Sequence, residues 1–88
     1  MPYFPGPRSD DELPPHVAAA LIGWARVQPK MALKRPGMPK EWCPLLECDP
    51  NEPDRAPLGG WVYVWVDNRV REIDGRALEI VKGTERPA

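Results

Sequence analysis

The sequence predicts an α+β domain: one N-terminal helix packed on a small antiparallel β-meander of three to five strands, with proline-rich extended arms. Residues 61–66 are six consecutive aromatic or β-branched residues, a pattern typical of a strand. Apolar residues recur at helical spacing within residues 15–27. The thirteen prolines among 88 residues favour extended segments elsewhere. We therefore expect an arm at residues 1–14, a single small domain at residues 15–83 and a tail at residues 84–88.

The expected helix covers residues 15–27. Pro15 suits a first helical turn, where its missing N–H costs nothing. Apolar side chains that share one helical face follow it, and Pro29 ends the helix because the residue before a proline disfavours helical geometry. The residues on the shared face are Val17, Ala20, Leu21 and Trp24.

Residues 28–60 hold seven prolines, yet so long a loop without any regular structure is unusual in a small domain. We expect two short strands in it, near residues 31–34 and 45–48, with a turn at residues 35–38. Pro44 would restrict the second of these strands to an edge or a bulge.

The expected meander continues from residues 61–66 into strands at residues 69–73 and 76–81, through turns at Asp67-Asn68 and Asp74-Gly75. Two-residue turns would pair Val66 with Arg69 and place arginines among the valines. Three-residue loops would give one aliphatic face and one aromatic, basic face. We prefer the second register because it separates the two faces more cleanly.

This register predicts a candidate partner-binding surface. Trp, Tyr and Arg are enriched at protein interfaces, and the aromatic face would carry all three. The favoured function is therefore a non-enzymatic protein–protein interaction module, such as a small inhibitor, an adaptor or an assembly subunit. Coverage of the aromatic row by the helix is the competing structural interpretation. The candidate residues are Trp61, Tyr63, Trp65, Arg69 and Arg71.

Charge is divided into two adjacent blocks, although the net charge is only −1. Residues 26–40 carry five basic residues and no acidic one, whereas residues 41–54 carry five acidic residues and no basic one. Pairing across a short hairpin is the simpler expectation; blocks that point apart would give one basic and one acidic patch. The alternative function is nucleic-acid binding, with the sheet aromatics stacking on bases, although the overall charge argues against it. Its residues would be Lys30, Lys34, Arg35 and Lys40.

The sequence gives little support for catalysis, so we expect no enzyme, no catalytic residues and no cofactor. The chain holds one histidine and one serine, His16 and Ser9, and no phosphate-binding or hydrolase motif. Cys43 and Cys48 with His16 fall short of the four ligands of a structural zinc site. Free thiols are therefore expected, with a disulfide or a metal as alternatives. No apolar run spans a membrane and no signal peptide is evident, which predicts a cytoplasmic protein.

Overall fold

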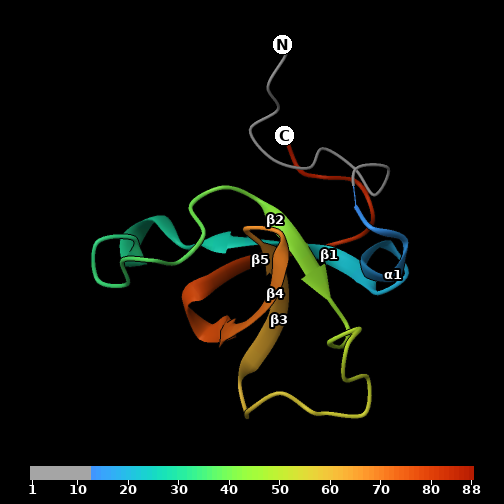
Figure 1. Ribbon diagram of the computed structural model, residues 1–88. Coiled ribbons are helices and arrows are strands. Elements are labelled where there is room, and N and C mark those ends of the chain that lie inside the picture. The colour runs from blue at the N-terminus through green and yellow to red at the C-terminus, as the bar shows by residue number, and fades with distance from the viewer. Residues whose placement is uncertain (1–12) are drawn as a thin grey trace.

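The computed structural model describes residues 13–88 and shows an antiparallel sheet of five strands (Figure 1). The predicted arm at residues 1–14 thus lies outside the described residues, except for Leu13 and Pro14. The strand order is β4-β3-β2-β1-β5. The strands are β1 (Leu21–Val27), β2 (Cys43–Leu46), β3 (Trp61–Val66), β4 (Arg69–Asp74) and β5 (Leu78–Lys82). The helical segments are α1 (Pro15–Ala18) and the 3-10 turns η2 (Pro29–Met31) and η3 (Gly75–Ala77).

The sheet must curl, because its two end strands are consecutive in the chain. Only η3 separates β4 from β5, although they stand at opposite ends of the strand order. In a flat sheet four strand spacings would place them about 19 Å apart. The four residue steps from Asp74 to Leu78 span at most about 14 Å when fully extended. The result is a small, partly open barrel, an architecture that, like the SH3-like barrels, serves many unrelated functions.

The predicted helix at residues 15–27, and with it the α+β class, is wrong. Only Pro15–Ala18 is helical, and Leu21–Val27 is the strand β1, which pairs with both β2 and β5. A β-bulge lies between Leu21 and Gly23, where β1 has one residue more than its partner. This extra residue brings Leu21 and Trp24 into the same core cluster. Their spacing of three residues is therefore the same as on one face of a helix, although both lie in a strand. The regular structure of the domain is almost wholly β-strand.

The two short strands predicted in residues 28–60 are only partly correct. Residues 31–34 form the end of η2 and turns rather than a strand. The second prediction, at residues 45–48, overlaps β2, which begins two residues earlier. Pro44 lies in β2, which is not an edge strand, so the predicted restriction to an edge is wrong. Its missing N–H is tolerated because β3 pairs with β2 only through Leu45 and Leu46.

The preferred register of the meander is also wrong. Val66 pairs with Arg69, so the turn has two residues. Asp67 and Asn68 both have positive φ, 56° and 59°, as a type I′ turn requires; both residue types tolerate that conformation. The expected third strand does not extend the meander, because β5 pairs with β1 and not with β4.

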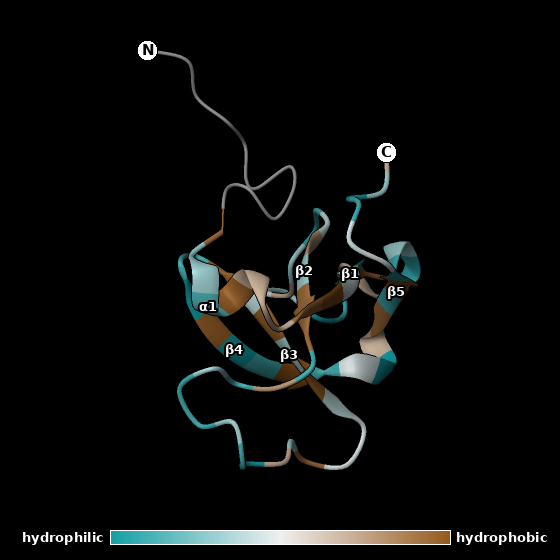
Figure 2. Ribbon diagram, turned by 90° about the vertical axis from the view of Figure 1, so that its right-hand side faces the viewer, coloured by the Kyte–Doolittle hydropathy of each residue, from teal (hydrophilic) through white to brown (hydrophobic). Residues whose placement is uncertain are grey.

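Apolar clusters cover both faces of the sheet, as the all-apolar strand β3 requires. The outer cluster packs α1 against the outside of the curled sheet, and the inner cluster fills the inside of the barrel. Figure 2 shows hydrophobic colour on much of the strands and mainly hydrophilic colour along the loop between β2 and β3. The outer cluster contains Leu13, Val17, Ala20, Leu21, Trp24, Trp42, Leu46 and Tyr63. The inner cluster contains Ala25, Cys43, Leu45, Val64, Ile73 and Leu78.

Candidate functional site

The predicted aromatic surface on β3 is largely used for packing. Tyr63 is 2% exposed, and its hydroxyl donates a 3.2 Å hydrogen bond to the Arg55 carbonyl. Trp65 is half-buried against the outer cluster, and its ring meets His16 of α1 edge to face at 6.4 Å. Trp61 is likewise half-buried. The helical segment α1 and Leu13 therefore pack on the face that was expected to be free.

The structure separates Arg69 and Arg71 from these aromatic side chains. Arg69 lies opposite Val66 and Arg71 lies opposite Val64, and residues directly opposite one another point to the same face. Val64 belongs to the inner cluster, whereas Tyr63 belongs to the outer one. The five residues predicted to bind a partner thus do not form one surface.

The four basic residues of the alternative prediction all lie in one loop, between β1 and β2. We call residues 28–42 the basic loop. The side chains of Lys30, Lys34, Arg35 and Lys40 are all exposed there. Leu33 lies among them and is 96% exposed, the most exposed large apolar side chain of the described residues. Sequence reasoning missed Leu33; its one signal was an apolar residue inside a basic, proline-rich stretch with no periodic apolar partner.

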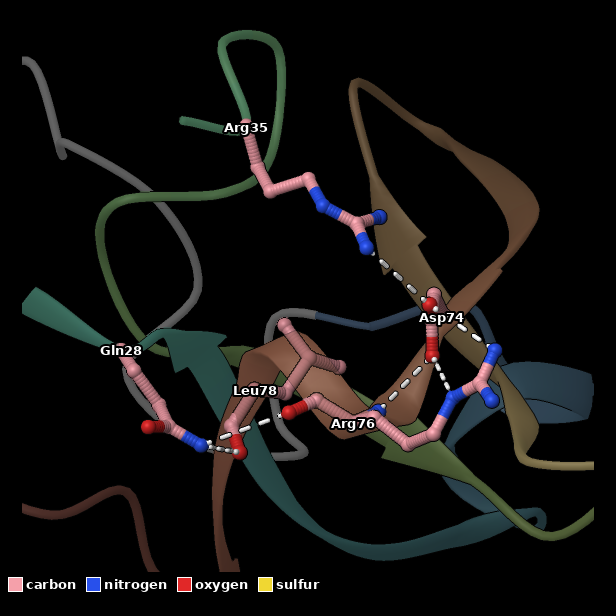
Figure 3. A network of polar contacts seen from close by, with 5 residues as sticks. All are labelled: Gln28, Arg35, Asp74, Arg76 and Leu78. Atoms are coloured by element: carbon pink, nitrogen blue, oxygen red, sulfur yellow. Dashed lines mark hydrogen bonds and ion pairs between the residues drawn. The ribbon is translucent and has the colours of Figure 1, made fainter. Parts of the chain in front are cut away.

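A polar network fixes the basic loop to the turn between β4 and β5 (Figure 3). The Gln28 side chain donates to the carbonyls of Arg76 and Leu78, at 3.5 and 3.2 Å, and the Gln28 backbone donates to Ala77 at 2.9 Å. Further along the loop, the Arg35 guanidinium reaches the Asp74 carboxylate at 3.6 Å. The basic side chains are therefore presented from a loop that is held at two points.

Asp74 is the centre of this network and is only 6% exposed. Its carboxylate accepts from the Arg76 side chain at 2.9 and 3.2 Å and from the Arg76 backbone at 3.0 Å. These hydrogen bonds from Arg76, with the charges of Arg76 and Arg35 adding to them, hold the pKa of Asp74 below its ordinary value. Asp74 was predicted only as a turn residue, so its role was not visible in the sequence.

We expect Asp74→Asn to lower the melting temperature at pH 7. The lowered pKa means that the carboxylate stabilises the fold above its ordinary pKa near 3.8, and that this contribution is lost as the pH falls below that value. The difference between the wild-type and Asp74→Asn melting temperatures should therefore shrink between pH 5 and pH 2.5, which calorimetry can follow. An equal difference at both pH values would show that the charge of Asp74 is unimportant.

Four of the five acidic residues of the acidic block lie in the loop between β2 and β3, which projects from another side of the sheet (Figure 1); Glu41 lies at the end of the basic loop. None of the ion pairs within residues 13–88 joins the acidic block to the basic block. The expectation that the blocks neutralise each other is therefore wrong, and the two patches point apart. The acidic loop is itself ordered: Glu72 binds both Arg55, at 3.0 Å, and the Leu58 N–H, at 2.7 Å.

An open groove of about 520 Å³ lies where the basic loop leaves β1. Its wall includes the Arg26–Glu79 ion pair at 2.9 Å, and the Arg26 guanidinium stacks over the Trp42 ring at 4.4 Å. Arg26 and Glu79 in the groove are thus paired with each other, and its lining residues include no nucleophile beside a base, so the groove suits surface contact better than chemistry. Its lining residues are Arg26, Gln28, Pro29, Lys30 and Glu79.

The cysteines are free thiols. Burial raises the pKa of Cys43 to about 12, and its thiol donates to the Ala25 carbonyl at 3.2 Å. It is therefore protonated at neutral pH and is a poor nucleophile. Within residues 13–88, no three His, Cys, Asp or Glu side chains are grouped so that they could hold a metal ion.

No helix among residues 13–88 has the length and apolar character needed to cross a membrane. Comparison of the chain with protein-family models, with curated protein sequences and with solved structures finds no match.

Proposed function

We propose that the protein is a non-enzymatic protein-interaction module that binds an acidic partner surface through the basic loop. The observation that carries this proposal is the exposure of Leu33, 96%, within a cluster of basic side chains. An apolar side chain so fully exposed has no structural role in the isolated domain, and apolar anchors surrounded by polar residues are typical of protein interfaces.

Electrostatics supports an acidic partner. Within the described residues, no ion pair includes Lys30, Lys34 or Lys40, so these charges are available to an incoming group. Complementary charge raises the rate of encounter and selects between partners, while the apolar contact supplies more of the affinity. The partner surface should therefore combine Asp or Glu residues with a pocket that accepts Leu33.

The anchoring of the loop supports the same proposal. The bonds from Gln28 and the Arg35–Asp74 ion pair restrain both the base and the middle of the loop. A restrained loop loses less conformational entropy on binding than a free one, which favours affinity.

The nucleic-acid alternative uses the same lysines but is less well supported. Non-specific binding to single strands uses aromatic side chains on which bases stack. The aromatic residues of β3 are buried or half-buried, and Tyr63 and Trp65 pack with the outer cluster. The exposed side chain among the lysines is aliphatic, and an aliphatic side chain offers no stacking surface to bases.

Selection of peptides from a random displayed library against the immobilised chain tests the proposal. We expect the selected peptides to carry Asp or Glu beside an apolar residue. Their affinity should fall about tenfold or more on Leu33→Asp, corresponding to about 1.4 kcal/mol, and by a similar factor on the double change Lys30→Glu, Lys34→Glu. The matched control is Arg69→Glu, which removes an exposed basic residue outside the loop and should leave binding unchanged.

Two results would count against the proposal. One is the selection of peptides whose binding does not depend on Leu33. The other is tight, salt-sensitive binding of a single-stranded oligonucleotide, measured by fluorescence anisotropy, that Lys34→Glu abolishes and Leu33→Asp leaves intact. That second pattern would favour the nucleic-acid alternative.

A further inference from the structure

The outer edge of β5 carries backbone groups that nothing in the described chain satisfies. β5 stands at one end of the strand order and pairs only with β1. Exposed edges of this kind are templates for pairing with another strand. On this strand Ile80 and Val81 are 38% and 39% exposed, so the edge is apolar as well as unpaired.

The register shows which groups point outward. The Gln28 N–H donates to the Ala77 carbonyl and the Gly83 N–H donates to the Ile22 carbonyl. The neighbouring pairs Val27↔Leu78 and Gly23↔Lys82 are therefore non-hydrogen-bonded pairs of the antiparallel ladder. In such a ladder alternate residues direct both backbone groups toward the neighbouring strand. Glu79 and Val81 therefore bond to β1, and the residues that point outward are Leu78, Ile80 and Lys82.

Leu78 is already satisfied. Its N–H binds the Gly75 carbonyl within η3, and its carbonyl accepts from the Gln28 side chain at 3.2 Å. Among residues 13–88 no such bond engages the outward groups of Ile80 or Lys82. The open edge thus consists of two residues, separated by one residue that faces β1.

This pattern is complementary to itself. We infer that β5 is a homodimerisation edge, at which two copies of the chain pair antiparallel about a two-fold axis through Val81. In that register Ile80 of one copy lies opposite Lys82 of the other, and each pair exchanges two hydrogen bonds, so four bonds satisfy all the outward groups. A self-complementary patch related by a two-fold axis is the usual geometry of a homodimer.

The side chains fit the same register. Val81 meets the partner's Val81 at the axis in a close, non-hydrogen-bonded pair, and the aliphatic stem of Lys82 covers the exposed Ile80. Glu79 faces Gly83 of the partner, which has open space at its Cβ position, so no side chain collides with it. The net charge of −1 opposes association only weakly. The interface is small, which predicts a weak dimer.

Sedimentation equilibrium of the full chain, up to about 1 mM because small interfaces bind weakly, tests the inference. We expect a monomer–dimer equilibrium. Val81→Lys places two like charges face to face and should weaken dimerisation about tenfold or more. Mixing Val81→Lys with Val81→Glu should restore a dimer containing one copy of each, which also shows that both variants are folded. Leu33→Lys is the control: it alters the basic loop and should leave dimerisation unchanged.

Amide hydrogen exchange supplies an independent readout. With rising protein concentration, the amides of Ile80 and Lys82 should become protected, while those of Glu79 and Val81, already bonded to β1, should not change. A monomer at all concentrations would overturn the inference, as would a dimer indifferent to Val81→Lys. A monomer whose Ile80 and Lys82 amides are protected only by selected peptides would assign the edge to a different partner. Because this surface excludes Leu33, failure here leaves the proposed function of the basic loop standing.

Discussion

Replacement of Trp24 by alanine is expected to remove about 3–5 kcal/mol of stability, the range for truncating a large buried aromatic side chain. Trp24 is fully buried and lies on β1, between β2 and β5, where the outer cluster joins α1 to the sheet. A domain of 88 residues has a total stability of about 4–13 kcal/mol. The variant should therefore lose a large share of its stability and unfold at much lower urea concentration.

The control for this experiment is Trp24→Phe. The indole N–H of Trp24 is buried without a hydrogen-bond partner in the described chain, which is itself unfavourable. Phenylalanine keeps most of the ring and removes that N–H, so its cost should be well below that of alanine. Equal losses for both variants would mean that the packed ring contributes little and would contradict the role given to the outer cluster.

Replacement of Gly23 by alanine is the second change with a large expected effect. An added Cβ would lie 2.5 Å from the Val81 carbonyl oxygen and 3.2 Å from the Lys82 Cα, both of them backbone atoms of β5. Neither can move without separating β1 from β5. We expect a loss of about 3 kcal/mol, the upper end of the range for overpacking, and a melting temperature lower by about 12 °C or more.

Gly59→Ala is the matched control for Gly23→Ala. Gly59 lies in the exposed loop before β3, and its added Cβ would meet nothing within 4 Å. Thermal unfolding of the two variants side by side should show a large shift at Gly23 and almost none at Gly59. A tolerated alanine at Gly23 would mean that β1 and β5 approach less closely than the structure shows.

The sequence predicts an element correctly where strand-forming residues, aromatic or β-branched, fill a whole segment. The aromatic and β-branched run of Trp61–Val66 forms β3, and the need to cover both of its faces is met by two apolar clusters. Around β1 the analysis failed because the bulge between Leu21 and Gly23 gives a strand the apolar spacing of a helix. Single-sequence periodicity cannot separate these cases, since the distinction depends on pairing with β2 and β5, both of which follow later in the chain.

The candidate site was predictable in part. Composition located the basic residues of the basic loop, which the structure places exposed in one loop. It could not show that Asp74 anchors Arg35, because that contact joins residues from distant parts of the chain. The two-residue turn at Asp67-Asn68 determines on which face of the sheet Arg69 and Arg71 lie, because a register different by one residue moves every side chain to the opposite face.

The position of β1 between β2 and β5 has a consequence for synthesis of the chain on the ribosome. β1 is made early, but its neighbour β5 follows only after residues 28–77, which take about 3–10 s to translate at typical rates. During that interval Trp24 and the other apolar residues of β1 lack one of their two flanking strands. The nascent chain therefore passes through a period of exposure to aggregation, which chaperone binding near residues 21–27 would relieve.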